Sequence, residues 1–254
     1  MSEREGQEAE SGDTMIGSVT TKGSRMTTRR STILLATLIL MYAYLPLQNE
    51  FEIRGLEYVL IGIVMAMVYT VSSGRVRTLI AIVLGLLIAV LLFLTDPATV
   101  ESRELTIGLY AVLGLFIGYS AILILFEVTQ TQEFNYHLIV SALSAYMLLA
   151  LLWAIIYTII EIAKPGSFLV NNDLAMAMPN DPSSIFELSL YFSMITITTV
   201  GYGDITPVSP AARSIATLEP IVGQLLLTVL VAWLVGMFIS ASLVKREEQR
   251  DKQD

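Results

Sequence analysis

The chain has 254 residues, of which 54% are hydrophobic and only 15% are charged, and its mean hydropathy is +0.68. A soluble domain carries about 25% charged residues, so this composition excludes an ordinary soluble protein and is typical of a helical membrane protein with several spans. The formal net charge of −8 comes partly from acidic residues near the N-terminus and indicates no particular partner. The absence of cysteine excludes disulfides, thiol catalysis and cysteine-based metal sites.

A polar N-terminus precedes a series of apolar stretches. Residues 1–30 are rich in Ser, Thr, Gly and Glu, and we expect them to form a disordered cytoplasmic tail. Because a helix needs about 20 apolar residues to cross a membrane, the sequence predicts several spans. The six expected spans lie at roughly 31–48, 57–73, 77–95, 105–126, 137–162 and 212–244. A further apolar stretch at about 183–198 is too short and too rich in Ser and Thr to span, and it predicts a re-entrant helix.

The loop charges indicate how the spans are oriented. Basic residues precede the first span, separate the second from the third and follow the sixth, namely Lys22, Arg25, Arg29, Arg30, Arg75, Arg77, Lys245 and Arg246. Since cytoplasmic loops carry an excess of Lys and Arg, we expect both termini in the cytoplasm. The loop 127–136 is an exception, because it should be cytoplasmic but contains Glu127 and Glu133 and no basic residue.

The first four expected spans, within 31–135, form a peripheral region. A span that responds to voltage needs several basic residues, since each charge gains ~2.3 kcal/mol per 100 mV. The fourth span at 105–126 contains no Arg or Lys. We therefore expect a lipid-facing scaffold without gating charges. The chain's histidine, His137, begins the fifth span near the inner surface, where an interfacial anchor is the expected role and pH sensing is the alternative.

Residues 198–204 read TTVGYGD and follow the re-entrant stretch, whose start at Asp181-Pro182-Ser183 is typical of a helix N-terminus. Gly201 and Gly203 take positive φ without steric cost, so the backbone can alternate between its two hands. Such alternation points consecutive carbonyls the same way, and stacked carbonyls can replace the hydration shell of K⁺. The C-terminus of the re-entrant helix then directs a partial negative charge at the start of this segment, which favours a cation.

This segment resembles the selectivity filter of the potassium channel family, and TTVGYGD is the most specific signature of that family. The resemblance implies that K⁺ is bound by the Thr199 hydroxyl and by the backbone carbonyls of Thr199, Val200, Gly201 and Tyr202. Gly203 and Asp204 complete the expected filter, 199–204. Because one chain supplies one strand, a ring of carbonyls needs four chains, and we expect a four-fold homotetramer. No cofactor is expected apart from K⁺ ions in the filter.

Residues beside the filter are expected to support it. Tyr191 and Phe192 occupy positions at which the family commonly has two aromatic side chains that buttress the filter, with plain interfacial packing as the alternative. Tyr191 is in position to hydrogen-bond Asp204, whose carboxylate lies at the outer mouth. Thr198 is expected to face the central cavity just below the filter.

The sixth span contains the candidate gate, Glu219-Pro220-Ile221-Val222-Gly223-Gln224. This span also looks like the inner helix of compact bacterial potassium channels, and the resemblance implies a location in the inner or plasma membrane of a bacterial cell. Proline removes a helix hydrogen bond, so Pro220 and Gly223 form an expected hinge, with close helix packing as the alternative role of Gly223. Gln224 is expected to line the cavity. Glu219 is ionisable inside the membrane and is expected to pair with hydroxyls behind the pore helix, in a structural or a regulatory role.

These patterns predict an all-α membrane protein with six transmembrane helices, a re-entrant pore helix and an extended filter. The expected domains are the tail 1–30, the peripheral region 31–135, the pore domain 136–244 with its pore helix at 182–198, and the short cytoplasmic tail 245–254. The expected function is passive conduction of K⁺, with a poorly selective cation channel or a subunit of a potassium uptake transporter as alternatives. Membrane lipid and other copies of the chain are the expected partners. Enzyme activity, nucleic acid, a small-molecule substrate and a cytoplasmic ligand-binding domain are not expected.

Overall fold

The computed structural model describes residues 31–44, 62, 79, 83, 103–130, 134–171 and 182–251, and these are mostly helical. A helix at Ser31–Tyr44 comes first. The later elements are α5 (Arg103–Gln130), α6 (Tyr136–Ala163), β1 (Phe168–Val170), α8 (Pro182–Ile197), β2 (Ile205–Pro207) and α9 (Pro210–Asp251). The tail 1–30, Asp181 and almost all of the expected spans 57–73 and 77–95 lie outside the described residues.

Three helices in the described part of the chain are long and apolar enough to cross a membrane. They are Arg103–Gln130, Tyr136–Ala163 and Pro210–Leu243, and each overlaps one of the last three spans expected from hydropathy. The helix Ser31–Tyr44, within the first expected span, is shorter. The expected re-entrant helix is α8, which ends at Ile197, one residue before the expected boundary.

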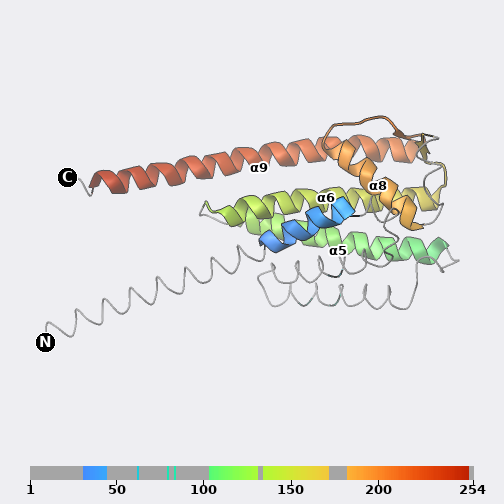
Figure 1. Cartoon of the computed structure of the whole chain (residues 1–254), viewed down its shortest axis with the longest axis horizontal. Helices are drawn as coiled ribbons and strands as arrows, with labels where there is room; N and C mark the ends of the chain where they lie inside the picture. The colour runs from blue at the N-terminus through green and yellow to red at the C-terminus, as the bar shows by residue number, and fades with distance from the viewer. Residues whose placement is uncertain are drawn as a thin grey trace.

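The outer helix α6 is the centre of the described structure, because it packs against α5, α8 and α9 (Figure 1). Its neighbour α5 approaches closely at Gly114, where an added Cβ would lie 3.1 Å from Ile155 Cγ2. The core between the helices is apolar and includes the buried side chains of Phe116, Leu148 and Ile155. This packing provides α8 and α9 with a fixed support.

A small antiparallel sheet joins the segments before and after α8, which the all-α prediction did not include. β1 pairs with β2 so that Phe168 lies opposite Pro207 and Val170 lies opposite Ile205. The side chain of Glu161 fixes the approach to β1, since its carboxylate accepts hydrogen bonds from the backbone N–H groups of Gly166 at 2.7 Å and Phe168 at 3.0 Å. The segment between α8 and α9 is thereby attached to the end of α6.

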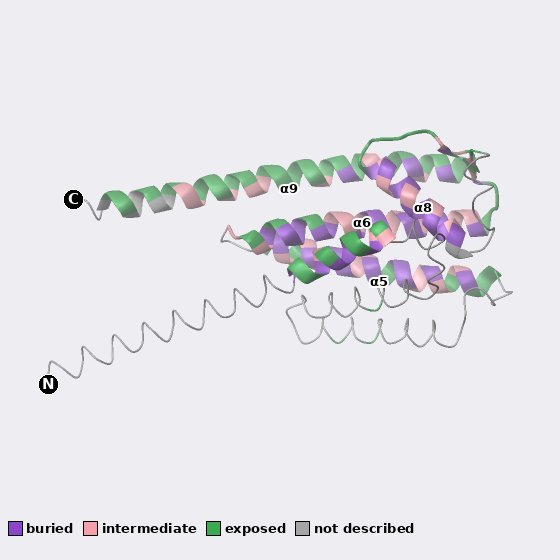
Figure 2. Cartoon of the chain, in the orientation of Figure 1, coloured by how far each residue is buried: buried purple, intermediate pink, exposed green. Residues whose placement is uncertain are grey.

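The inner helix α9 has 42 residues, which corresponds to about 63 Å at the usual rise per residue. Its first turns pack against α6 and α8, later residues such as Leu230 and Phe238 still contact the other described helices or the segment before α6, and its C-terminal part extends beyond them, largely exposed (Figure 2). The exposed apolar side chains on it are Leu218, Ile221, Val222, Leu225, Leu227, Val229, Val231, Val235, Phe238, Ile239 and Leu243. A single chain therefore leaves most of the apolar surface of α9 uncovered.

Candidate ion-conduction site

The TVGYGD segment connects the C-terminus of α8 to β2 and has a repeating backbone conformation. Positive φ angles occur at Thr199 (61°), Gly201 (53°) and Gly203 (82°), whereas Val200 and Tyr202 between them have none. Glycine adopts this conformation readily, as the sequence predicts for the two glycines. Thr199 was not predicted to do so, because a β-branched residue rarely has positive φ. The backbone thus changes hand at every residue from Thr199 to Gly203.

The end of α8 is tied to the filter by a complete set of hydrogen bonds. The last four carbonyls of a helix have no partner inside it, and an apolar environment makes unpaired carbonyls costly. In α8 the carbonyls of Met194, Ile195, Thr196 and Ile197 accept, respectively, from Thr198 N at 3.3 Å, Gly201 N at 3.0 Å, Thr199 N at 2.9 Å and the Tyr146 hydroxyl at 3.0 Å. Three donors belong to the segment after the helix and the fourth belongs to α6. The helix terminus therefore positions the filter backbone.

Asp204 is held at the other end of the filter by contacts to its side chain and its backbone. The Tyr191 hydroxyl donates to Asp204 Oδ2 at 2.5 Å, and Ile205 N donates to Oδ1 at 3.1 Å. Asn171 N donates to the backbone carbonyl of Asp204 at 3.0 Å.

Phe192 of α8 is part of an aromatic cluster to which three elements contribute. Its ring packs edge-to-face on Tyr157 of α6 at 5.1 Å and on Phe168 of β1 at 5.3 Å between centroids. Tyr157 and Phe168 also contact each other at 5.4 Å. Such aromatic pairs contribute about 0.5–1.5 kcal/mol beyond the burial of their area. Phe192 thus anchors α8 to the outer helix. Its partners were missed because no short-range pattern links residues so far apart in sequence.

The filter strand itself is open on one side in a single chain. Val200 is 51% exposed and Tyr202 is 73% exposed, and Thr198 and Thr199 are exposed as well. The Thr198 hydroxyl donates to the Met194 carbonyl at 2.5 Å. One strand by itself cannot surround an ion.

The residues of the candidate gate fall into two groups on α9. Glu219 is 0% exposed and its carboxyl oxygens lie within hydrogen-bond distance of hydroxyls of α6 and α8, as the sequence predicts, whereas Gln224 is exposed. Gly223 is buried, and an added Cβ would lie 2.5 Å from Ile197 Cγ1. The close-packing role of Gly223 therefore has a specific contact, at the end of the pore helix. α9 is helical without a break through Pro220.

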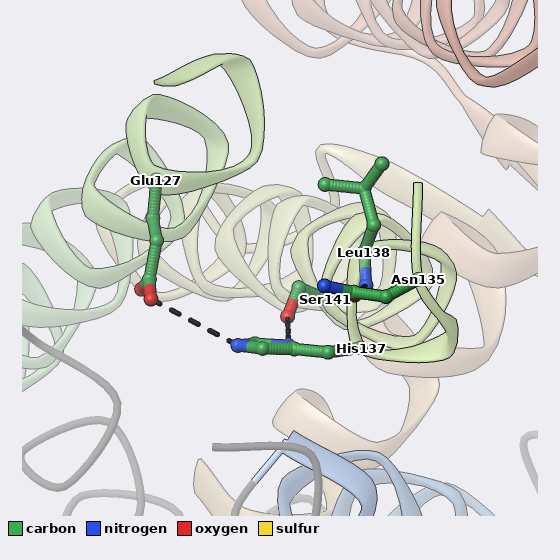
Figure 3. A network of polar contacts seen from close by, with 5 residues as sticks. All are labelled: Glu127, Asn135, His137, Leu138 and Ser141. Atoms are coloured by element: carbon green, nitrogen blue, oxygen red, sulfur yellow. Dashed lines mark hydrogen bonds and ion pairs between the residues drawn. The ribbon is translucent and has the colours of Figure 1, made fainter. Parts of the chain in front are cut away.

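His137 lies at the junction of α5 and α6 (Figure 3), at the opposite end of α6 from β1. Its Nδ1 is 2.8 Å from Ser141 Oγ, and its Nε2 is 3.9 Å from Glu127 Oε1. Asn135 caps the same helix terminus by accepting from Leu138 N at 3.1 Å. The geometry is that of a side chain bridging two helices. In the ranges that the structure describes, no group of three or more His, Cys, Asp or Glu residues could hold a metal ion.

Comparison with known proteins covers the same part of the chain. Residues 145–240 match a family model described as an ion channel. The chain is 36% identical over 86 residues to Protein LctB of Bacillus caldotenax, covering 34% of this chain and 61% of that protein. It is 32% identical over 105 residues to the inward rectifier potassium channel Kirbac3.1 of Paramagnetospirillum magnetotacticum, covering 38% of this chain and 31% of that protein. The chain thus spans less than two thirds of the length of either relative.

The matched residues include most of α6 and all of α8, the filter segment and the membrane-crossing part of α9 up to residue 240. The match to an ion channel model and the three long apolar helices in the described residues together support a membrane protein. The similarity to Kirbac3.1 points to the potassium channels within that group. Residues 145–240 are therefore similar to an ion channel domain, and the similarities support the potassium channel family.

Proposed function

We propose that this chain is one of four identical subunits of a channel that conducts K⁺ passively and selectively. The observation that carries the proposal is the alternation of backbone hand through Thr199, Gly201 and Gly203, at the C-terminus of α8. A backbone of this kind can present consecutive carbonyls to one line of ions. The ion ligands proposed are the carbonyls of Thr199, Val200, Gly201 and Tyr202 with the Thr199 hydroxyl.

The tetramer is part of the same proposal. One filter strand leaves its ions open to water, and Val200 and Tyr202 are exposed in a single chain. Four strands around an axis would replace the hydration shell of K⁺ with carbonyl oxygens from all sides. The exposed apolar residues of α9 would then meet either the other subunits or lipid. Both termini are proposed to be cytoplasmic, and residues 136–244 form the pore domain.

A poorly selective cation channel remains the competing reading of the same geometry, and ion selectivity decides between them. The transporter reading is weaker. Potassium uptake proteins with filter-like loops resemble four degenerate repeats in one chain, and this sequence has one GYG segment.

The first prediction concerns the positive φ of Gly201. Gly201→Ala places a Cβ on a left-handed residue, which costs roughly 1–2 kcal/mol per subunit and disturbs the carbonyl alignment. We expect the wild type to favour K⁺ over Na⁺ strongly in planar bilayers and the variant to lose most of that preference. Gly236→Ala is the matched control, because Gly236 is helical and has nothing within 4 Å of an added Cβ. Near-equal permeability of the wild type to both ions would overturn the proposed selectivity.

The second prediction concerns the hydrogen bond from Tyr191 to Asp204. Tyr191→Phe removes the donor and frees the outer end of the filter, at a cost of about 1 kcal/mol per subunit. We expect reduced K⁺ flux into liposomes and a lower thermal midpoint for the purified tetramer. Tyr136→Phe, at an exposed position in the first turn of α6, is the control and should change neither quantity. Unchanged flux and stability in Tyr191→Phe would show that the contact does not support the filter.

The third prediction concerns the proposed flexing of α9 at Pro220 and Gly223. Because Gly223 also contacts Ile197, its substitution would confuse hinge and packing effects, whereas Pro220→Ala restores a helix hydrogen bond without adding bulk. We expect Pro220→Ala to stiffen the inner helix and to lower the frequency of openings in single-channel recordings. Openings as frequent as those of the wild type would argue against a hinge at this position.

The fourth prediction concerns voltage. α5 contains no Arg or Lys after Arg103, so its movement would carry no gating charge through the membrane. We expect the open probability in symmetric K⁺ to vary weakly between strongly negative and strongly positive potentials. A steep conductance–voltage curve would require a voltage-sensing element elsewhere in the assembly.

A further inference from the structure

The most deeply buried acidic side chain in the channel domain joins three helices. Glu219 of α9 is fully buried, and its Oε2 lies 2.5 Å from the Tyr157 hydroxyl of α6. Its Oε1 lies 2.5 Å from Ser193 Oγ of α8. Ser193 Oγ also lies 2.7 Å from the backbone carbonyl oxygen of Ala150, in α6. The four groups form one chain of contacts directly behind the pore helix.

The number of hydrogen atoms on these four groups decides whether Glu219 is charged or neutral. Tyr157 and Ser193 each have a single hydroxyl hydrogen, and the Ala150 carbonyl has none. If Glu219 were a carboxylate, the hydrogen of Ser193 would have to serve both Ala150 O and Glu219 Oε1, and one short oxygen–oxygen contact would contain no hydrogen. If Oε1 carries a proton, Glu219 donates to Ser193, Ser193 donates to Ala150 and Tyr157 donates to Oε2. Three hydrogens then match three contacts.

The surroundings supply no positive charge to stabilise a carboxylate. In the part of the chain that the structure describes, no Lys, Arg or His lies within ion-pair distance of Glu219. The titratable side chains with which it interacts are phenols, namely Tyr42 of the helix Ser31–Tyr44 and Tyr146 and Tyr157 of α6. A buried charge without a counter-ion is strongly disfavoured.

The packed helices carry further charged or titratable groups, among them Glu161, which accepts from Gly166 N and Phe168 N, and Tyr191, which donates to Asp204. Two more have positions away from Glu219. Glu187 of α8 precedes Ser193 by six residues, which places the two about 120° apart around the helix. Arg213 of α9 is exposed, and its Nε donates to the Pro207 carbonyl at 3.2 Å. Neither is in contact with the carboxyl group of Glu219.

We propose that Glu219 is held as a neutral carboxylic acid that donates a hydrogen bond to Ser193, and that it acts as a positioning residue for the filter. The relay Glu219–Ser193–Ala150 connects the inner helix and the outer helix to α8. Ser193 lies six residues before Thr199, so a shift of α8 at Ser193 reaches the filter directly. The proposed protonation state of Glu219 does not depend on the proposed function of the protein. The proposed effect of Glu219 on conduction does rest on that function.

Loss of this proton has two consequences in each subunit. The donor to Ser193 disappears, and an unpaired negative charge is left between three helices. We therefore expect K⁺ conduction to fall as the pH is raised far enough to ionise the buried acid. Glutamine keeps one donor and one acceptor in nearly the same shape, so Glu219→Gln mimics the neutral acid and cannot ionise.

The protonation state is tested by infrared spectroscopy on the purified protein at neutral pH. The wild-type-minus-Glu219→Gln difference spectrum should contain the carbonyl stretch of a protonated carboxylic acid, and Ser193→Ala should move that band to higher frequency. Glu187→Gln, which removes another buried carboxyl among the residues that the structure describes, is the matched control and should leave the band in place. A difference spectrum containing only carboxylate stretches would overturn the proposal.

The positioning role is tested by K⁺ flux into liposomes as a function of pH, on variants that elute as tetramers. Glu219→Gln should keep flux within about twofold of the wild type at neutral pH and lose the alkaline decline, because it preserves the hydrogen-bonding pattern. Glu219→Asp is one methylene shorter, cannot span both hydroxyls and should lower flux at every pH. A large loss of flux in Glu219→Gln, or an alkaline decline like that of the wild type, would overturn the role. If the wild type itself carries no K⁺, the proposed function fails while the infrared result still decides the protonation.

Discussion

The anchoring of the C-terminus of α8 is the constraint on which the rest of the channel domain depends. Four helix carbonyls must find donors in an environment that offers little water, and three of those donors come from the residues that immediately follow the helix. The filter backbone is thereby bent back onto the helix that precedes it, and Gly201 N is fixed by the Ile195 carbonyl. The remaining carbonyl is held by Tyr146, which makes α6 part of the same support.

Several polar side chains of residues 145–240 are buried between the helices, a place that apolar side chains usually occupy in a soluble protein. Behind α8, the buried hydroxyls of Ser193 and Tyr157 surround Glu219, and they connect three helices through hydrogen bonds. In contrast, apolar residues cover the outside of α9. In lipid, apolar burial does not by itself favour one helix arrangement over another, so directional contacts of this kind select the arrangement. The edge-to-face ring contacts of Phe192 with Tyr157 and Phe168 also stabilise this interface.

Small residues decide how closely the elements approach. Gly114 lets α5 approach Ile155 of α6, and Gly223 lets α9 lie against Ile197 at the end of the pore helix. The second contact joins the inner helix to the residue whose carbonyl accepts from Tyr146. Movement of α9 near Gly223 would therefore act on the end of α8 and on the TVGYGD segment that follows it, which is the proposed ion pathway.

The sequence by itself determined the membrane class, the positions of the spans that the structure describes and the two positive-φ glycines of the TVGYGD segment. These features are local: about 20 consecutive apolar residues are enough to cross a bilayer, and TTVGYGD carries its backbone requirement in its glycines. The hydrogen bond between Tyr191 and Asp204 could also be predicted from the sequence. The two residues are only 13 positions apart, and the end of α8 and the TVGYGD segment that follows it set the distance between them. Only the tertiary structure decided the positive φ of Thr199, the pairing of β1 with β2 and which residues supply the hydroxyl partners that the sequence predicts for Glu219. Those partners are 26 and 62 residues distant, and such contacts depend on how helices pack together, which no local pattern encodes.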